Sequence, residues 1–162
     1  MNMKYALRSE DTEQINVIQW VQYQIPHHPE LKLLHHCPNG GSRNKAEAVK
    51  LKQMGVVAGV PDIHLPVPKR IYTGLYIEMK YGSGRLEKSQ REFLKEAAKY
   101  GNYCVVCYGA EEAINIIAQY VNLKPIDTGQ KENEMKIRNG CILREGKVRE
   151  YDGSERLYCA AA

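Results

Sequence analysis

The chain has 162 residues and a net charge of +4, with 43% hydrophobic and 26% charged residues. This length and composition are typical of one globular domain with its own core, and the mild positive charge is compatible with a polyanionic partner. No apolar run is long enough to span a membrane, and the start of the chain, MNMKYALRSEDTEQ, lacks the apolar core of a signal peptide, so we expect a cytoplasmic protein.

The first regular element predicted is a helix over residues 9–25, SEDTEQINVIQWVQYQI. Ser9 is a good N-cap, and the acidic residues after it suit the first turn of a helix. At about 100° per residue, the apolar side chains form one broad stripe that faces the core. The stripe consists of Ile15, Val17, Ile18, Val21 and Ile25. Because Glu10 falls in the middle of this stripe and Glu13 at its edge, we expect Glu10 to point inward, with Glu13 as the alternative.

Three elements are predicted next, within residues 31–55. The segment LKLLHHC at 31–37 is typical of a strand, and PNGGS at 38–42 of a turn or loop. The segment NKAEAVKLKQMG predicts a helix, with Asn44 as its N-cap and Gly55 as its terminator.

The remaining pattern predicts strands over 61–67, 75–81 and 103–109, and helices over 89–101 and 110–121. A capping box of Ser89 and Glu92 begins the first of these helices. A short loop joins the first two strands, which are therefore expected to be antiparallel. The third strand follows a helix and is expected to join the sheet by a parallel crossover.

This order of elements predicts an α/β fold, a small mixed β-sheet flanked by helices. We assign residues 1–121 to one domain. Residues 122–162 are more polar and are predicted to form a linker and a hairpin, with Asn139 and Gly140 at the turn.

The cysteines and histidines suggest metal sites, but their spacing argues against them. The five cysteines are an odd number without a secretion signal, which disfavours a disulfide framework. Cys104 and Cys107 lie three apart on a predicted strand, so their thiols face opposite sides and are expected to be free. Neighbouring His35 and His36 also face opposite sides of a strand, which disfavours a zinc site.

Acidic and basic side chains converge on one face of the strands at 61–67 and 75–81. Glu78 and Lys80 are two apart on a strand and share a face, and antiparallel pairing can bring Asp62 beside Glu78. Two carboxylates this close repel each other unless a divalent cation uses both as ligands. The backbone carbonyl of Met79 is a candidate third ligand. Lys80 beside such a metal can hold a phosphate or position a water.

Two further side chains are predicted to face this site. Gln90 lies on the inward face of the next helix, and Glu10 can approach from the first helix. The alternative is that Glu78 and Lys80 form the solvated face of an edge strand. The presence of Asp62 together with Gln90 and Glu10 argues against that reading.

The motifs Gly59-Val60-Pro61-Asp62, Glu78-Met79-Lys80 and Ser89-Gln90 resemble, in order and spacing, those of the VRR-NUC nucleases. This family (virus-type replication-repair nucleases) belongs to the PD-(D/E)XK superfamily. The resemblance covers residues 9–121, and within the family the sequence is similar to the stand-alone, phage-type members. Glu10 matches the acidic residue of the family's first helix.

The resemblance implies a restriction-endonuclease-like core and Mg²⁺- or Mn²⁺-dependent hydrolysis of DNA phosphodiesters. Asp62 and Glu78 would bind the metal, Lys80 would orient the attacking water, and Gln90 and Glu10 would support the site. Small members of the family look like homodimers that cut branched DNA such as Holliday junctions. A nucleic-acid-binding module of the same fold without cleavage activity is the alternative, and the complete set of acids favours the enzyme.

Four basic residues are candidates for contacts with DNA phosphates. Arg85 and Lys88 adjoin the predicted active site, and Arg43 and Lys45 lie at the start of the second predicted helix. For Arg43 and Lys45 an ordinary loop with a capped helix explains the sequence equally well. The segment PNGGSRNK lacks the ending of a P-loop, which disfavours an ATPase.

Overall fold

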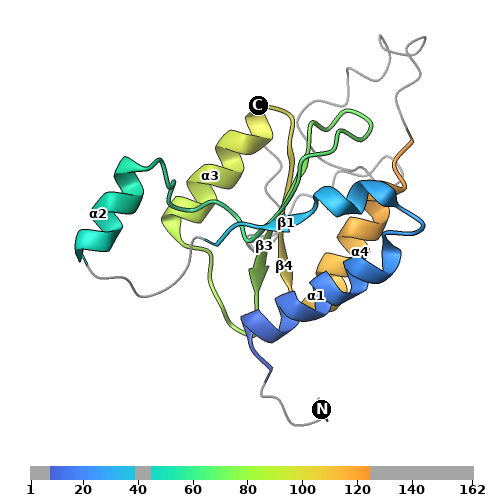
Figure 1. Cartoon of the computed structure of the whole chain (residues 1–162), viewed down its shortest axis with the longest axis horizontal. Coiled ribbons are helices and arrows are strands. Elements are labelled where there is room, and N and C mark those ends of the chain that lie inside the picture. The colour runs from blue at the N-terminus through green and yellow to red at the C-terminus, as the bar shows by residue number, and fades with distance from the viewer. Residues whose placement is uncertain (1–7, 39–44, 125–162) are drawn as a thin grey trace.

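The computed structural model describes residues 8–38 and 45–124 (Figure 1). The elements in chain order are α1 (Glu10–Gln24), the 3₁₀ helix η2 (Pro29–Leu33), β1 (His35–His36), α2 (Lys45–Gln53), β2 (Ile63–Leu65), β3 (Leu75–Lys80), α3 (Lys88–Lys99), β4 (Tyr103–Tyr108) and α4 (Ala110–Val121). The predicted C-terminal hairpin, Arg43 and the predicted N-cap Asn44 lie outside the described residues. Within the described ranges, no helix combines the length and the apolar character needed to cross a membrane.

The sheet has four strands in the order β1-β2-β3-β4. β2 pairs with β3 antiparallel, with Ile63 opposite Ile77, and β3 pairs with β4 in parallel, with Lys80 opposite Tyr108. The antiparallel and the parallel pairing were both predicted from the sequence and are confirmed, and so is the mixed α/β fold. β3 lies between two strands, but its pairing with β2 ends at Ile77, so Glu78 and Lys80 pair with β4 alone among the described strands. Both side chains are buried and do not form a solvated face.

Helices cover both faces of the sheet, and each face has its own core. Figure 1 shows α1 and α4 together on one side and α3 on the other. The larger core joins α1 and α4 to one face of β3 and β4, where Cys107 is buried. The smaller core joins Leu94 of α3 to Cys104 and Val106 on the opposite face of β4. The two thiols therefore face opposite sides of β4, as predicted, and both are free.

Two local predictions near the start of the chain were wrong. Residues 31–37 do not form one strand, because the chain turns through η2 with Pro29 in its first turn, and only His35 and His36 pair in β1. The buried face of α1 is centred on Glu13, Val17 and Val21, and Ile15 is 53% exposed. The stripe calculated from the sequence was too broad to locate this centre, since packing against α4 decides which side of it is buried.

The predicted start of α3 was also wrong. The helix begins at Lys88 with Glu87 as its N-cap, so Ser89 lies inside the first turn and does not cap it. The side chain of Gln90 accepts a hydrogen bond from the backbone N–H of Glu87 at 2.9 Å. Gln90 therefore stabilises the start of the helix that carries it.

Candidate active site

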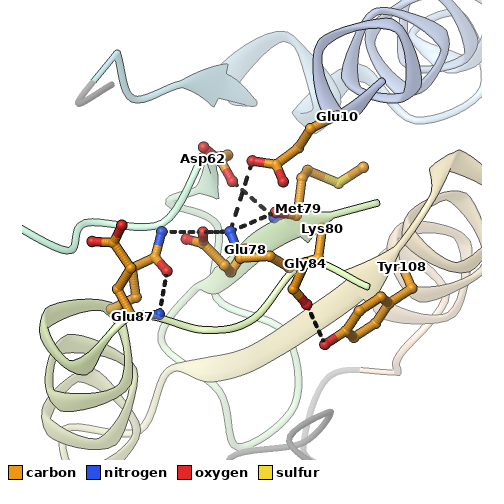
Figure 2. Close-up of polar contacts among 9 residues, drawn as sticks. Glu10, Asp62, Glu78, Met79, Lys80, Gly84, Glu87 and Tyr108 are labelled. Carbon is orange, nitrogen blue, oxygen red and sulfur yellow. Dashed lines mark hydrogen bonds and ion pairs between the residues drawn. The ribbon is translucent and has the colours of Figure 1, made fainter. Parts of the chain in front are cut away.

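Figure 2 shows Glu10, Asp62, Glu78 and Lys80 together where β3 ends, and Gln90 joins them through its contact with Glu78. Glu78 and Lys80 come from β3, Asp62 from the residue before β2, Glu10 from the first turn of α1, and Gln90 from the first turn of α3. All five were predicted from the sequence. The contacts among them show how each is held and what the group can bind.

Glu78 is the buried centre of the site, with 1% of its surface exposed. Its Oε1 atom accepts hydrogen bonds from Lys80 Nζ, at 2.6 Å, and from Gln90 Nε2. Its Oε2 atom is buried without a hydrogen-bond partner among the described residues. Burial and the nearby charge of Asp62 raise the pKa of Glu78 to about 7, although Lys80 opposes this change. A buried carboxylate with one unsatisfied oxygen is a group that a cation would stabilise.

Asp62 is fixed on both sides by backbone contacts. Its Oδ2 atom accepts a hydrogen bond from the N–H of Met79 at 2.8 Å, which holds the carboxylate against β3. Its backbone carbonyl accepts from the N–H of Cys37, at 2.8 Å, and contacts His36 Nδ1 at 2.7 Å. The carboxylate of Asp62 is therefore held against the backbone of β3 one position before the paired residues Ile63 and Ile77.

Gly59 allows the loop that carries Asp62 to lie against α3. Its φ angle is +82°, and a Cβ atom there would overlap the carbonyl group of Ser89 and come within 2.7 Å of the backbone nitrogen of Gln90. Only glycine combines this conformation with so close an approach. The spacing of Gly59 and Asp62 thus has a physical reason, because the glycine brings Asp62 and Gln90 to one place.

Lys80 is 6% exposed and surrounded by oxygen atoms. Its Nζ atom lies 2.6 Å from Glu78 Oε1, 3.0 Å from the carbonyl oxygen of Met79 and 3.7 Å from Glu10 Oε1. Burial lowers the pKa of Lys80, but the hydrogen bond and charge of Glu78 outweigh this effect and raise it above its ordinary value. Lys80 therefore carries a charge at neutral pH. The carbonyl of Met79, a candidate metal ligand, here accepts from Lys80.

The two acids of the first helix that were candidates for the site, Glu10 and Glu13, have different places. Glu10 faces Lys80, and its pKa is raised by burial, while Lys80 lowers it and Asp62 raises it further. Glu13 is turned away toward α4, where it accepts from Arg8 and from the backbone of Ala110. The geometry therefore places Glu10 in the site, as preferred from the sequence, even though Glu13 is the more buried of the two.

The basic residues predicted to contact DNA differ in their positions. Arg85 is exposed in the loop between β3 and α3, and Lys88 is exposed at the start of α3, where it lies 3.8 Å from Glu92. Lys45 opens α2, which Figure 1 shows standing away from the sheet. Arg85 and Lys88 thus lie in the segment that leads from Lys80 to Gln90, and their contact with DNA stays a prediction.

Sequence reasoning missed Tyr108, whose hydroxyl donates to the carbonyl of Gly84 at 3.1 Å. This bond ties the end of β4 to the loop that carries Arg85. The parallel pairing of β4 with β3 places Tyr108 opposite Lys80, so the predicted topology contained the signal needed to find it.

The donor atoms present fit a hard divalent cation. Glu78 supplies a buried, unsatisfied oxygen, Asp62 supplies a second carboxylate, and Met79 supplies a backbone carbonyl. Oxygen ligands of this kind suit Mg²⁺ or Mn²⁺ better than softer metals. No cluster of three His, Cys, Asp or Glu side chains within residues 8–38 and 45–124 is arranged to hold a metal, so these two acids would need the carbonyl and water to complete the coordination.

The mixed sheet with helices on both faces and the acid–lysine cluster at the end of β3 is consistent with a nuclease of the α/β class. The VRR-NUC domain family matches residues 6–111. A solved structure described as a VRR_NUC domain protein has a TM-score of 0.65 and 34% identity, covering 75% of this chain and 95% of that chain. No curated protein matches the chain significantly. The chain belongs to the VRR-NUC domain family, which is a family of nucleases.

Proposed function

We propose that this protein is an Mg²⁺- or Mn²⁺-dependent deoxyribonuclease that hydrolyses phosphodiester bonds at the site formed by Asp62, Glu78 and Lys80. The observation that carries the proposal is the buried carboxylate of Glu78, whose Oε2 atom has no hydrogen-bond partner in the part of the chain that the structure describes. A protein that used Glu78 only for stability would satisfy this oxygen or expose it to water. Asp62, Glu78 and the carbonyl of Met79 would hold the cation.

The side chains of the site divide the chemistry between them. When bound, the metal would supply a Lewis acid that polarises the phosphate and activates a water. Gln90 and Lys80 both donate to Oε1 of Glu78, so only Oε2 is left to face a cation. The ammonium group of Lys80 is fixed and charged, which suits it to orient the attacking water or to stabilise negative charge on the phosphoryl oxygens.

The proposed substrate is branched DNA, such as a four-way junction. Arg85 and Lys88 are exposed, which supports contacts to phosphates, and such contacts give affinity without reading bases. A nuclease that recognises the DNA backbone selects by shape more than by sequence. The sequence resemblance to stand-alone members that cut junctions supports the same substrate.

We further propose a homodimer. One active site reaches one phosphodiester, and symmetric resolution of a junction requires two cuts, which a two-fold dimer provides. Light scattering at assay concentration is expected to give twice the mass of the chain. A monomer that still makes paired incisions would contradict the dimer.

The alternative is a nucleic-acid-binding protein of the same fold that does not cleave. Both proteins would bind DNA, so only turnover separates them. The complete set of Asp62, Glu78 and Lys80, with Lys80 buried and paired, favours the enzyme.

The test is incubation with labelled single strands, duplexes, flaps and four-way junctions in Mg²⁺, in Mn²⁺ and in EDTA. We expect cleavage with either metal, highest on the branched DNA, and none in EDTA. The matched control is Asp62→Asn, which keeps the oxygen that accepts from Met79 but removes the charge. Cleavage that is undiminished in excess chelator or in Asp62→Asn would contradict the metal mechanism, and binding without cleavage would support the alternative.

A further inference from the structure

We propose that Glu13 is a positioning residue, whose buried carboxylate fixes the first turn of α1 against α4 and thereby holds Glu10 beside Lys80. The inference rests on the proposed function for its effect on cleavage. Its geometric part, the link from Glu13 to the placement of Glu10, stands on the contacts described below and can be tested without activity.

Glu13 caps a helix from a distant part of the chain. Its Oε2 atom accepts a hydrogen bond at 2.8 Å from the N–H of Ala110, the first residue of α4. The N-cap of α4 is Gly109, which has no side chain to cap the first turn, and the N–H of Ala110 has no acceptor within the helix. A carboxylate at a helix N-terminus is also favoured by the helix dipole. Glu13 thus supplies the cap that the local sequence lacks.

The close approach of α1 to α4 depends on this glycine. Gly109 has a φ angle of +87°, and a Cβ atom there would lie 3.2 Å from Oε2 of Glu13. A larger residue would be strained and would press on the carboxylate. The start of α4 is therefore shaped to receive the Glu13 side chain.

These contacts connect β3, α4 and α1 to one another around Lys80. The N–H of Gly109 donates to the backbone carbonyl of Lys80 at 2.9 Å, which ties the start of α4 to the end of β3. The next residue, Ala110, is bonded to Glu13. One helical turn before Glu13 stands Glu10, whose Oε1 atom lies 3.7 Å from Lys80 Nζ. Because Glu10 reaches Lys80 only through α1, a shift of the first turn would change this distance.

Arg8 provides a second connection between Glu13 and the end of β3. Arg8 donates from Nε to Oε1 of Glu13 at 2.7 Å, and its guanidinium lies 5.5 Å from the ring centre of Tyr81, the residue after Lys80. The two carboxylate oxygens of Glu13 thus accept from different groups, Oε1 from Arg8 and Oε2 from Ala110. With 2% of Glu13 exposed, this is a buried charge with two partners, and an apolar side chain would fill the space without fixing the register of α1.

The experiment compares Glu13→Ala and Glu13→Gln with Glu10→Gln and with the double variant Glu13→Ala/Glu10→Gln. The measurements are single-turnover cleavage of a junction with Mg²⁺, thermal unfolding, and the crystal structure of Glu13→Ala. The stability control is Val17→Ala, which changes a buried residue of the same helix. If Glu13→Ala does not fold, the same rates and stabilities are compared for Glu13→Gln and Arg8→Ala. These variants can keep the hydrogen bond from Ala110 to the side chain at position 13.

We expect Glu13→Ala to cleave about 10- to 100-fold more slowly, since a displacement of about 1 Å at a reacting group can cost about 10²-fold. Glu13→Gln keeps an oxygen for Ala110 and is expected to recover part of the rate. In the Glu10→Gln background Glu13→Ala should cause no further loss of rate, while its loss of thermal stability should be the same in both backgrounds. Val17→Ala should lose stability but keep its rate.

The outcomes separate the positioning role from the proposed function. A wild type that cleaves no DNA overturns the proposed function, and the crystal structure then decides the positioning role alone. An unchanged distance between Glu10 and Lys80 in Glu13→Ala would overturn the inference. So would losses of rate that add in the double variant, or a rate for Glu10→Gln equal to that of the wild type.

Discussion

Replacement of Glu78 by glutamine is expected to make the metal-free protein more stable at alkaline pH. The pKa of this carboxyl is raised from 4.5 to about 7 by burial first and by Asp62 second. Between these two values the folded protein binds a proton that the unfolded chain has lost, so stability falls as the pH rises. A difference of about 2.5 pKa units, at about 1.4 kcal/mol each, corresponds to about 3 kcal/mol.

The substitution removes the charge and keeps the shape. In Glu78→Gln the side-chain oxygen can still accept from Lys80 and Gln90, while the amide replaces the oxygen that lacks a partner. The attraction between Glu78 and Lys80 is already included in the pKa of about 7, so it does not reverse the sign. We therefore expect the variant to exceed the wild type in unfolding free energy by up to about 3 kcal/mol at pH 8, and by little at pH 4.5.

The assay is urea unfolding in EDTA at pH 4.5, 6 and 8, with the exposed Glu111→Gln as the control that removes the same charge at the surface. The measurement is then repeated with Mg²⁺ or Mn²⁺. Metal at about 100 times its dissociation constant stabilises a folded protein by about 2.7 kcal/mol, so it should reduce or reverse the advantage of Glu78→Gln. A variant that is less stable than the wild type at pH 8 in EDTA would refute the reasoning that burial dominates the pKa of Glu78.

Three further predictions follow from the same contacts. Lys80→Ala should keep a metal affinity near that of the wild type, measured by calorimetry, while single-turnover cleavage falls by about 10²–10⁴-fold; an unchanged rate would make Lys80 a bystander. Gly59→Ala should lower the unfolding free energy by about 1–3 kcal/mol more than Gly82→Ala, because both have positive φ but only Gly59 contacts α3. Affinity for two unrelated junction sequences should fall alike with rising salt; a difference of more than about tenfold at one salt concentration would contradict recognition by shape.

The arrangement within the sheet could be predicted because it depends on short-range geometry. A strand has a period of two, so Glu78 and Lys80 had to share a face once residues 75–81 were identified as a strand. The short connection to the preceding strand required antiparallel pairing, which places Asp62 one position before the pair of Ile63 and Ile77. These steps use only local pattern and chain connectivity, and the structure confirms the pairing.

The environment of Glu13 could not be predicted in the same way. Besides Arg8, its partner is a backbone N–H that is 97 residues away, and no residue type marks that group in the sequence. The helical stripe placed Glu10 at the centre of the buried face, whereas packing against α4 puts Glu13 there. Which backbone N–H a carboxylate accepts from depends on how the helices pack in three dimensions. The sequence pattern therefore identified Glu10 and Glu13 as candidates but could not assign their partners.

The residues that orient this site also satisfy the ends of the helices around it. Gln90 accepts from the N–H of Glu87 at the start of α3 and donates to Glu78, and Glu13 accepts from the N–H of Ala110 at the start of α4. Each helix start has donors without partners inside the helix, so these bonds stabilise the fold as well as the geometry. A substitution of Gln90 or Glu13 should therefore lower stability and rate together. The side chain of Lys80 caps no helix, so its removal leaves the starts of α3 and α4 intact and acts on the fold through its buried partner Glu78.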